Sequence, residues 1–146
     1  MKIFLAGIMQ GSRREEAMHD QDYRPRLKEL IEAHLPDAQV YCPLQTHPGS
    51  FGYSYARGRD VFMHHNRMAA ECDVLVAYLP EASMGTAVEM WEAHRTGRVV
   101  LTISPLTKNW VVKYLSDRIY PTLEAFQRGL HSGEVAEAVA EKRTRA

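Results

Sequence analysis

A short apolar run at residues 73–78 leads directly into a glycine-containing loop and then a helical segment, and this succession constrains the fold most strongly. The run, DVLVAY, contains β-branched residues and, after its first residue, no charged interruption, which is the pattern of a strand covered on both faces of a parallel sheet. The proline and the glycine of the loop at 79–85 end the strand. This stretch therefore predicts a strand–loop–helix unit of an α/β fold.

The rest of the chain repeats this alternation of strands and helices. Further strands are expected at residues 2–6, 38–41, 98–103 and 118–120. Helices are expected at residues 22–35, 60–71, 86–96, 111–115, about 123–130 and from 134 onward. Such alternation predicts a flavodoxin- or Rossmann-like, doubly wound parallel five-stranded sheet with helices on both faces and the strand order 2-1-3-4-5. We expect a single domain over residues 1–146, with a frayed tail at about 141–146.

Composition limits the kind of partner. The formal net charge is zero, so the chain lacks the basic footprint that binding to polymeric nucleic acid requires. Cys42 and Cys72 occur singly, which indicates buried, reduced thiols rather than a zinc knuckle or a disulfide framework. His64 and His65 are adjacent and cannot form an i, i+4 metal pair, so no metal site is expected. The first apolar run is too short for a signal peptide or a membrane span, which favours a cytoplasmic protein without a membrane partner.

Three loops are expected to meet at the carboxyl edge of this sheet, where open parallel sheets bind their ligands. They are the segments at residues 7–14, 79–85 and 104–110. The first carries a GxxxGS spacing and two arginines, and it could bind phosphate through its backbone amides and Arg13 or Arg14. A solvated turn with surface arginines explains the same residues equally well.

Two interpretations of Glu89 remain open from the sequence. Thr86-x-x-Glu89 fits a capping box, in which both side chains satisfy backbone donors at a helix start. Alternatively, the carboxylate lies where a strand end meets a helix start, and the helix dipole is expected to keep it ionised. A fixed, ionised carboxylate beside a turn containing serine and glycine is what covalent chemistry on a nucleotide sugar requires.

Residues 43–59 are expected to form a long irregular loop, because they show neither strand nor helix periodicity. Phe51, Tyr53 and Tyr55 argue that this loop covers a ligand, and an aromatic ring there could stack on a base. The alternative is that the rings close the edge of the core. His47 is a possible general acid in the same loop.

The segments FLAGIMQGSRR, DVLVAYLPEASMGTAVEMWEA and VVLTISPL resemble the nucleoside 2-deoxyribosyltransferase superfamily, including its nucleotide N-glycosidase branch. The resemblance implies that Glu89, which follows the Gly85 turn, is the nucleophile that attacks the anomeric carbon. It also implies that Ser83 binds a 5′-phosphate, because members that act on free nucleosides have an aspartate there. A carboxylate would repel a phosphate dianion, whereas a hydroxyl at a helix start would bind it.

The resemblance extends to further positions. It implies that a phosphate-binding loop is formed by Gly7, Gly11, Ser12 and Arg13. Phe4 stands where many members have a tyrosine, which leaves the choice between ribose and deoxyribose open. His65 stands where members have an aspartate that protonates the departing base, and a histidine can donate that proton too.

Asn109 has two interpretations, one as a residue that reaches a neighbouring subunit's site and one as a simple turn residue. Similar enzymes are dimers or larger, so the resemblance implies a homodimer or higher homo-oligomer. Tyr53 completes the set of expected substrate-binding residues.

The predicted function is hydrolysis of the N-glycosidic bond of a (deoxy)ribonucleoside 5′-monophosphate through a covalent glycosyl ester of Glu89. His65, or alternatively His47, would assist departure of the base. No cofactor is expected, and the partner is a small nucleotide or nucleoside. The alternatives are a nucleoside 2-deoxyribosyltransferase that exchanges bases on free deoxynucleosides and a non-catalytic nucleotide-binding module.

Overall fold

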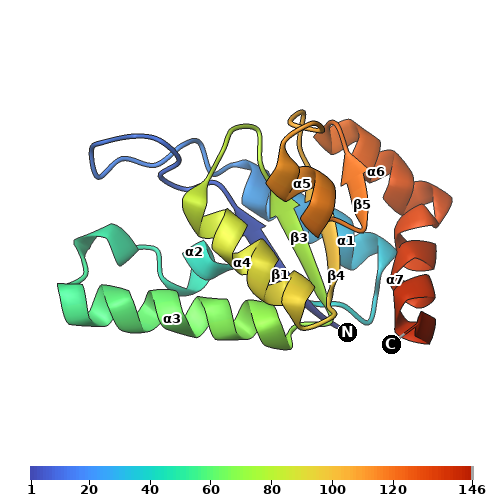
Figure 1. Cartoon of the computed structure of the whole chain (residues 1–146), viewed down its shortest axis with the longest axis horizontal. Coiled ribbons are helices and arrows are strands. Elements are labelled where there is room, and N and C mark those ends of the chain that lie inside the picture. Colours follow the sequence, from blue (N-terminus) through green and yellow to red (C-terminus); the bar gives the residue numbers. More distant parts are fainter. Residues whose placement is uncertain (146) are drawn as a thin grey trace.

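Five parallel strands form the central sheet of the computed structural model, which describes residues 1–145 (Figure 1). Their order is β2-β1-β3-β4-β5, which confirms the expected topology. The strands are β1 (Lys2–Gly7), β2 (Gln39–Tyr41), β3 (Val74–Tyr78), β4 (Val99–Ile103) and β5 (Arg118–Tyr120).

Helices cover both faces of the sheet, as a doubly wound fold requires. They are α1 (Tyr23–His34), α2 (Pro43–Thr46), the 3-10 turn η1 (Ser50–Gly52), α3 (Tyr55–Glu71), α4 (Met84–Arg95), α5 (Trp110–Leu115), α6 (Leu123–Ser132) and α7 (Glu134–Arg145). One face packs against α1, α6 and α7, and the other packs against α3, α4 and α5. In Figure 1, α4 lies across the front of the sheet and α1 lies behind it.

Alternate residues of each strand enter opposite core layers, because successive side chains of a strand point to opposite faces. Ile3 and Leu5 belong to the layer under α1, α6 and α7, whereas Phe4 and Ala6 belong to the layer under α3 and α4. Both thiols, Cys42 and Cys72, are buried and free, as expected.

The expectation of an irregular loop over residues 43–59 is wrong. The segment contains α2 and η1, and α3 begins at Tyr55 rather than at Asp60. Ser54 provides the start signal, since its extended backbone and its hydroxyl, which accepts a hydrogen bond from the Arg57 amide at 3.4 Å, form an N-cap. The exposed Tyr55 side chain points to solvent as part of that first turn.

The C-terminal helix α7 runs from Glu134 to Arg145, as expected from residue 134 onward. The expected fraying at about residues 141–146 stays a prediction. The Lys142 ammonium donates hydrogen bonds to the Arg98 carbonyl and to the Asp117 carboxylate, both at 2.7 Å, which ties this end of the helix to the sheet. Ala146 lies outside the described residues.

Candidate active site

A cavity of about 320 Å³ lies at the carboxyl ends of β1 and β3. It brings together sequence-predicted residues from three segments, namely Gly7, Gly11, His65, Ser83, Gly85 and Glu89. Its size falls at the lower end of the range of small-molecule sites, about 300–1,000 Å³. The predicted convergence of the loops after β1 and β3 is thus present, and His65 reaches the same cavity from α3.

The two glycines of the first loop are required by packing. A Cβ at Gly7 would lie 3.0 Å from the Tyr23 ring carbon Cζ, so no larger residue fits without moving that ring. Gly11 has φ +60°, a conformation that residues with a Cβ rarely adopt, and the His19 ring lies directly against it. The Tyr23 hydroxyl donates a hydrogen bond to the Ile8 carbonyl at 3.0 Å, which fixes the start of the loop.

Helix α4 begins one turn before the position that the sequence suggested. Ser83, in an extended conformation, is its N-cap and accepts hydrogen bonds from the Thr86 amide at 3.4 Å and from the Thr86 hydroxyl at 3.1 Å. The capping box of Thr86 and Glu89 is therefore wrong, because Glu89 lies in the second turn of the helix. Its side chain is half-buried and faces the cavity instead.

Burial raises the pKa of Glu89 from 4.5 to about 8, and the nearby Arg24 guanidinium opposes this shift only in part. The expectation that the helix dipole keeps Glu89 ionised is therefore wrong at neutral pH. Helix dipoles stabilise a charge by about 0.3–1 kcal/mol at exposed sites, whereas desolvation of a carboxylate is a larger effect. With a pKa of about 8, Glu89 is mostly protonated at pH 7 and becomes mostly ionised in mildly alkaline solution.

His65 projects from α3 into the same cavity and is held by aromatic neighbours. Its Nε2 lies 3.1 Å from the Tyr41 hydroxyl, and its ring centroid lies 5.4 Å from that of His47 and 6.2 Å from that of Phe4. Burial, with smaller contributions from His47, His64 and Arg24, lowers the pKa of His65 to about 4. His65 is consequently neutral at pH 7.

Arg24 is a charged cavity residue that the sequence interpretation missed. It is almost completely buried, and its guanidinium donates to the Leu5 carbonyl at 3.2 Å, the Gly7 carbonyl at 3.0 Å and the Gln21 side-chain oxygen at 2.7 Å. A signal was present, because Arg24 precedes Leu27 and Ile31 by three and seven residues, on the apolar stripe of α1.

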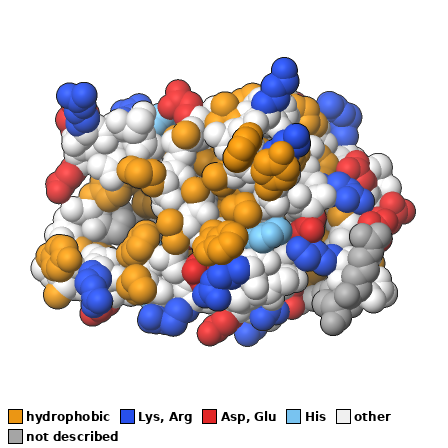
Figure 2. All heavy atoms as spheres, viewed as in Figure 1, with side chains coloured by type: hydrophobic (Ala, Val, Ile, Leu, Met, Phe, Trp, Pro, Cys, Tyr) orange, Lys and Arg blue, Asp and Glu red, His pale blue; other side chains and the backbone are white. Residues whose placement is uncertain are grey.

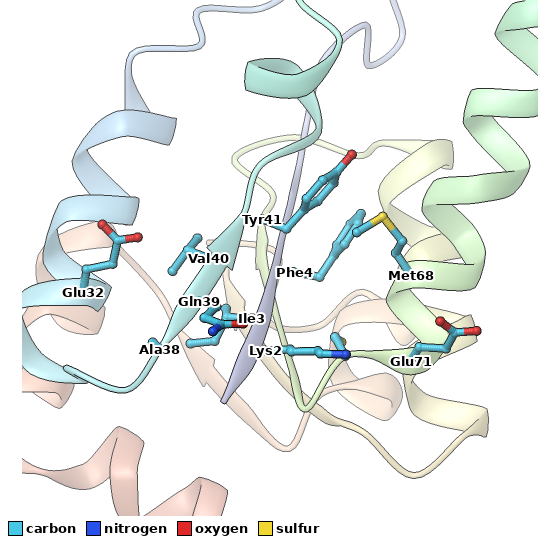
Figure 3. Close-up of a pocket in the computed structure, with 11 residues that line it drawn as sticks. Lys2, Ile3, Phe4, Glu32, Ala38, Gln39, Val40, Tyr41, Met68 and Glu71 are labelled. Carbon is cyan, nitrogen blue, oxygen red and sulfur yellow. The ribbon is translucent and has the colours of Figure 1, made fainter.

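Several predicted substrate-binding residues lie outside this cavity. Phe4 is buried and stacks on Tyr41 with ring centroids 5.7 Å apart. Figure 3 shows these two rings beside Met68, in a separate groove of about 560 Å³ along β1 and β2. The Tyr53 hydroxyl lies 3.0 Å from His47 Nδ1, so this pair supports the aromatic wall behind His65.

Ser12 and Asn109 line a second cavity of about 330 Å³, which adjoins the first and shares Gly11 and Ser83 with it. The Asn109 side-chain oxygen accepts hydrogen bonds from the amides of Val111 at 3.0 Å and Val112 at 3.4 Å, so it caps α5. Arg13 is exposed in the loop after β1.

Two negative observations apply to the described residues, 1–145. They contain no group of three or more histidine, cysteine, aspartate or glutamate side chains placed to hold a metal ion. Within the same range, no helix is both long enough and apolar enough to cross a membrane.

No protein-family model and no curated protein matches the chain. Solved structures do match. A 2-deoxyribosyltransferase from the psychrotolerant bacterium Bacillus psychrosaccharolyticus is 17% identical with a TM-score of 0.65, over 87% of this chain and 90% of that one. A conserved protein from Enterococcus faecalis is 19% identical with a TM-score of 0.67, over 90% of this chain and 98% of that one. At these identities the likeness shows a shared fold.

Proposed function

We propose that this protein hydrolyses the N-glycosidic bond of a nucleoside 5′-monophosphate, with Glu89 as the nucleophile. The observation that carries the proposal is that Glu89 shares one cavity with Ser83, the glycine loop after β1 and His65. These are the groups needed to attack a sugar carbon, hold a phosphate and protonate a base. The structural likeness to a 2-deoxyribosyltransferase supports chemistry at the sugar–base bond.

The phosphate end of the substrate is assigned to the start of α4. The Ser83 hydroxyl already accepts two hydrogen bonds from Thr86, so its own hydrogen remains available to donate to a phosphate oxygen. The helix has 12 residues, and the positive end of its dipole and the unpaired amides of its first turn favour an anion. These features support a monophosphate over a free nucleoside.

The chemical step uses the single proton that Glu89 carries at rest. Transfer of this proton to His65 leaves a carboxylate that attacks C1′ and forms a glycosyl ester, while His65 returns the proton to the departing base. Water then attacks C1′, its hydroxyl remains on the sugar, and its other proton restores the Glu89 carboxylic acid. The net reaction consumes one water and releases the free base and the sugar phosphate, as in retaining glycosidases.

Transfer of the proton from Glu89 to His65 costs free energy in the resting protein. Glu89 holds its proton more tightly than His65 does, with pKa values of about 8 and about 4, so the reactive pair is a minor form of the resting protein. A difference of this size corresponds to roughly 5 kcal/mol. Substrate binding has to supply that stabilisation.

The second candidate function is exchange of bases between deoxynucleosides, and the likeness to a 2-deoxyribosyltransferase favours it specifically. It uses the same ester of Glu89, which a second base resolves instead of water. The third candidate is a non-catalytic nucleotide-binding module. The raised pKa of Glu89 favours it, because a mostly protonated carboxyl is a poor nucleophile.

The experiment is a base-release assay over all ribo- and deoxyribonucleoside 5′-monophosphates and the free nucleosides, with wild type and Glu89→Ala. We expect release from a monophosphate by the wild type that is lost in the variant. Release that requires an added acceptor base would establish the transferase. Binding of a nucleotide without turnover would establish the module.

We also propose that the protein forms a homodimer or a larger homo-oligomer through the face made by α3, α4 and α5. Every exposed large hydrophobic side chain among the described residues lies on these three helices: Tyr55, Phe62, Met63, Met84, Val88, Trp91, Trp110, Val111 and Tyr114. Figure 2 shows hydrophobic side chains gathered across this face.

The exposed aromatics of this face supply most of the area of a standard interface. At ~200 Å² for an aromatic side chain, the exposed parts of its five aromatics present roughly 600 Å². A standard interface buries about 800 Å² on each partner. Phe62 and Met84 belong both to this face and to the wall of the cavity, so a second copy would also shield Glu89 from solvent.

A further inference from the structure

Arg24 is a buried cation whose hydrogen bonds go to neutral acceptors. These are the carbonyls of Leu5 and Gly7, the Gln21 side-chain oxygen and, at 3.8 Å, the Cys42 sulfur. A guanidinium has five N–H donors, and these contacts use four of them. One hydrogen on Nη2 is left for a further partner, and Arg24 lines the cavity that contains Glu89.

Burying a charge away from water is expensive unless an opposite charge or a set of hydrogen bonds compensates it. The hydrogen bonds to β1 orient the guanidinium but bring no negative charge. Glu89 is the acidic side chain in the lining of the same cavity. Ionisation of Glu89 therefore gives the buried Arg24 guanidinium the negatively charged neighbour that its hydrogen bonds do not provide.

The other titratable groups around Glu89 do not supply this charge. From α1, Tyr23 is a phenol whose pKa is raised by burial. From α3, His65 is neutral, because burial lowers its pKa to about 4. The buried Cys42 sulfur accepts a hydrogen bond from Arg24 Nη1 at 3.8 Å. The Arg24 charge is thus the local source of positive potential at the Glu89 carboxyl.

We propose that Arg24 is a positioning residue whose charge makes the ionised, nucleophilic form of Glu89 accessible near neutral pH. This proposal rests on the proposed function, in which Glu89 is the nucleophile. Arg24 contacts no reacting atom in this scheme. It acts by stabilising the carboxylate before attack, and its hydrogen bonds to the Leu5 and Gly7 carbonyls fix the place from which it acts.

The test measures the ionisation of Glu89 directly and needs no turnover. The carboxyl carbon of Glu89 is followed by carbon-13 NMR as a function of pH, with Glu89→Gln used to assign its signal. We expect a midpoint near 8 in the wild type. In Arg24→Met and Arg24→Gln the midpoint should rise by at least about one unit, which is about tenfold in the ionisation constant. Arg24→Lys keeps the charge and should stay within about half a unit of the wild type.

Arg26→Met is the matched control, because Arg26 lies on the same helix but is exposed and pairs with Glu124 at 3.6 Å. It should leave the midpoint unchanged. A wild-type midpoint retained in folded Arg24→Met or Arg24→Gln would overturn the proposal. Loss of the fold in both neutral variants even at about pH 6, where Glu89 keeps its proton, would assign Arg24 a purely structural role and overturn it too. A failed base-release assay would instead refute the proposed function and leave this titration valid.

Discussion

Replacing Glu89 by glutamine should stabilise the protein in alkaline solution while leaving it unaffected in mild acid. The native state holds the Glu89 proton up to a pKa of about 8, whereas a glutamate in the unfolded chain loses it near 4.5. Between these values unfolding releases a proton, so the free energy of unfolding falls as the pH rises. Above about 8 both states are ionised and this contribution to the slope ends.

The magnitude follows from the pKa difference. Each pKa unit corresponds to about 1.4 kcal/mol, so the shift of Glu89 sets a ceiling of about 5 kcal/mol. We therefore expect Glu89→Gln to be more stable than the wild type by up to about 5 kcal/mol near pH 9 and to match it near pH 4.

The assay is urea unfolding followed by far-UV circular dichroism at a series of pH values for both proteins. The difference between the two curves isolates Glu89, because all other titrating groups are shared. Glu29→Gln, at an exposed position in α1, is the matched control and should track the wild type throughout. A constant difference between Glu89→Gln and the wild type from acid to alkali would refute the raised pKa and the proton inventory built on it.

Three further predictions concern catalysis, packing and assembly. If His65 supplies the proton, kcat/KM of the wild type should stay constant between about pH 4 and pH 8 and fall above pH 8. His65→Asn should have a lower kcat/KM that rises as the pH passes about 8. Identical pH profiles for the two proteins would exclude this role. Gly7→Ala should lower the free energy of unfolding, measured in urea, by about 1–3 kcal/mol, because the new Cβ meets Tyr23. Gly85→Ala should be at least as stable as the wild type, because its Cβ would meet no atom within 4 Å. Trp110→Glu should dissociate the oligomer in sedimentation velocity, and a monomeric wild type would contradict the interface.

The sheet was predictable because its signals are local and repeated. The uninterrupted apolar run at β3 and its repetition at β4 indicate buried parallel strands, and the alternation with helices determines the strand order. The convergence of Ser83, Glu89 and the glycine loop followed from the same topology, since the carboxyl ends of parallel strands share one edge.

The helix starts and the ionisation state of Glu89 depend on the three-dimensional surroundings of each residue. Ser83 and Thr86 are both plausible caps, and the extended backbone at Ser83 decides between them. Residues 43–59 lack helical periodicity, yet the Ser54 cap starts α3 at Tyr55 and overcomes the weak helix propensity of Gly58. The ionisation state of Glu89 depends on burial, which sequence position does not reveal.

For Arg24 the sequence supports both a buried and an exposed position. It stands in YRPRLKE, a segment rich in charges that resembles the solvent-exposed start of an amphipathic helix. Its spacing to Leu27 and Ile31 points inward, but a charged residue is almost never fully buried unless it is paired. Only the carbonyls at the end of β1 show why this position accepts an arginine.

Acid-quenched mass spectrometry would detect the proposed covalent bond between Glu89 and the sugar. The protein is mixed with its preferred nucleoside 5′-monophosphate, quenched during turnover and digested. We predict a sugar-phosphate adduct on the peptide that contains Glu89, absent in Glu89→Gln together with base release. Base release at the wild-type rate by Glu89→Gln, or an adduct on a different residue, would rule out Glu89 as the nucleophile.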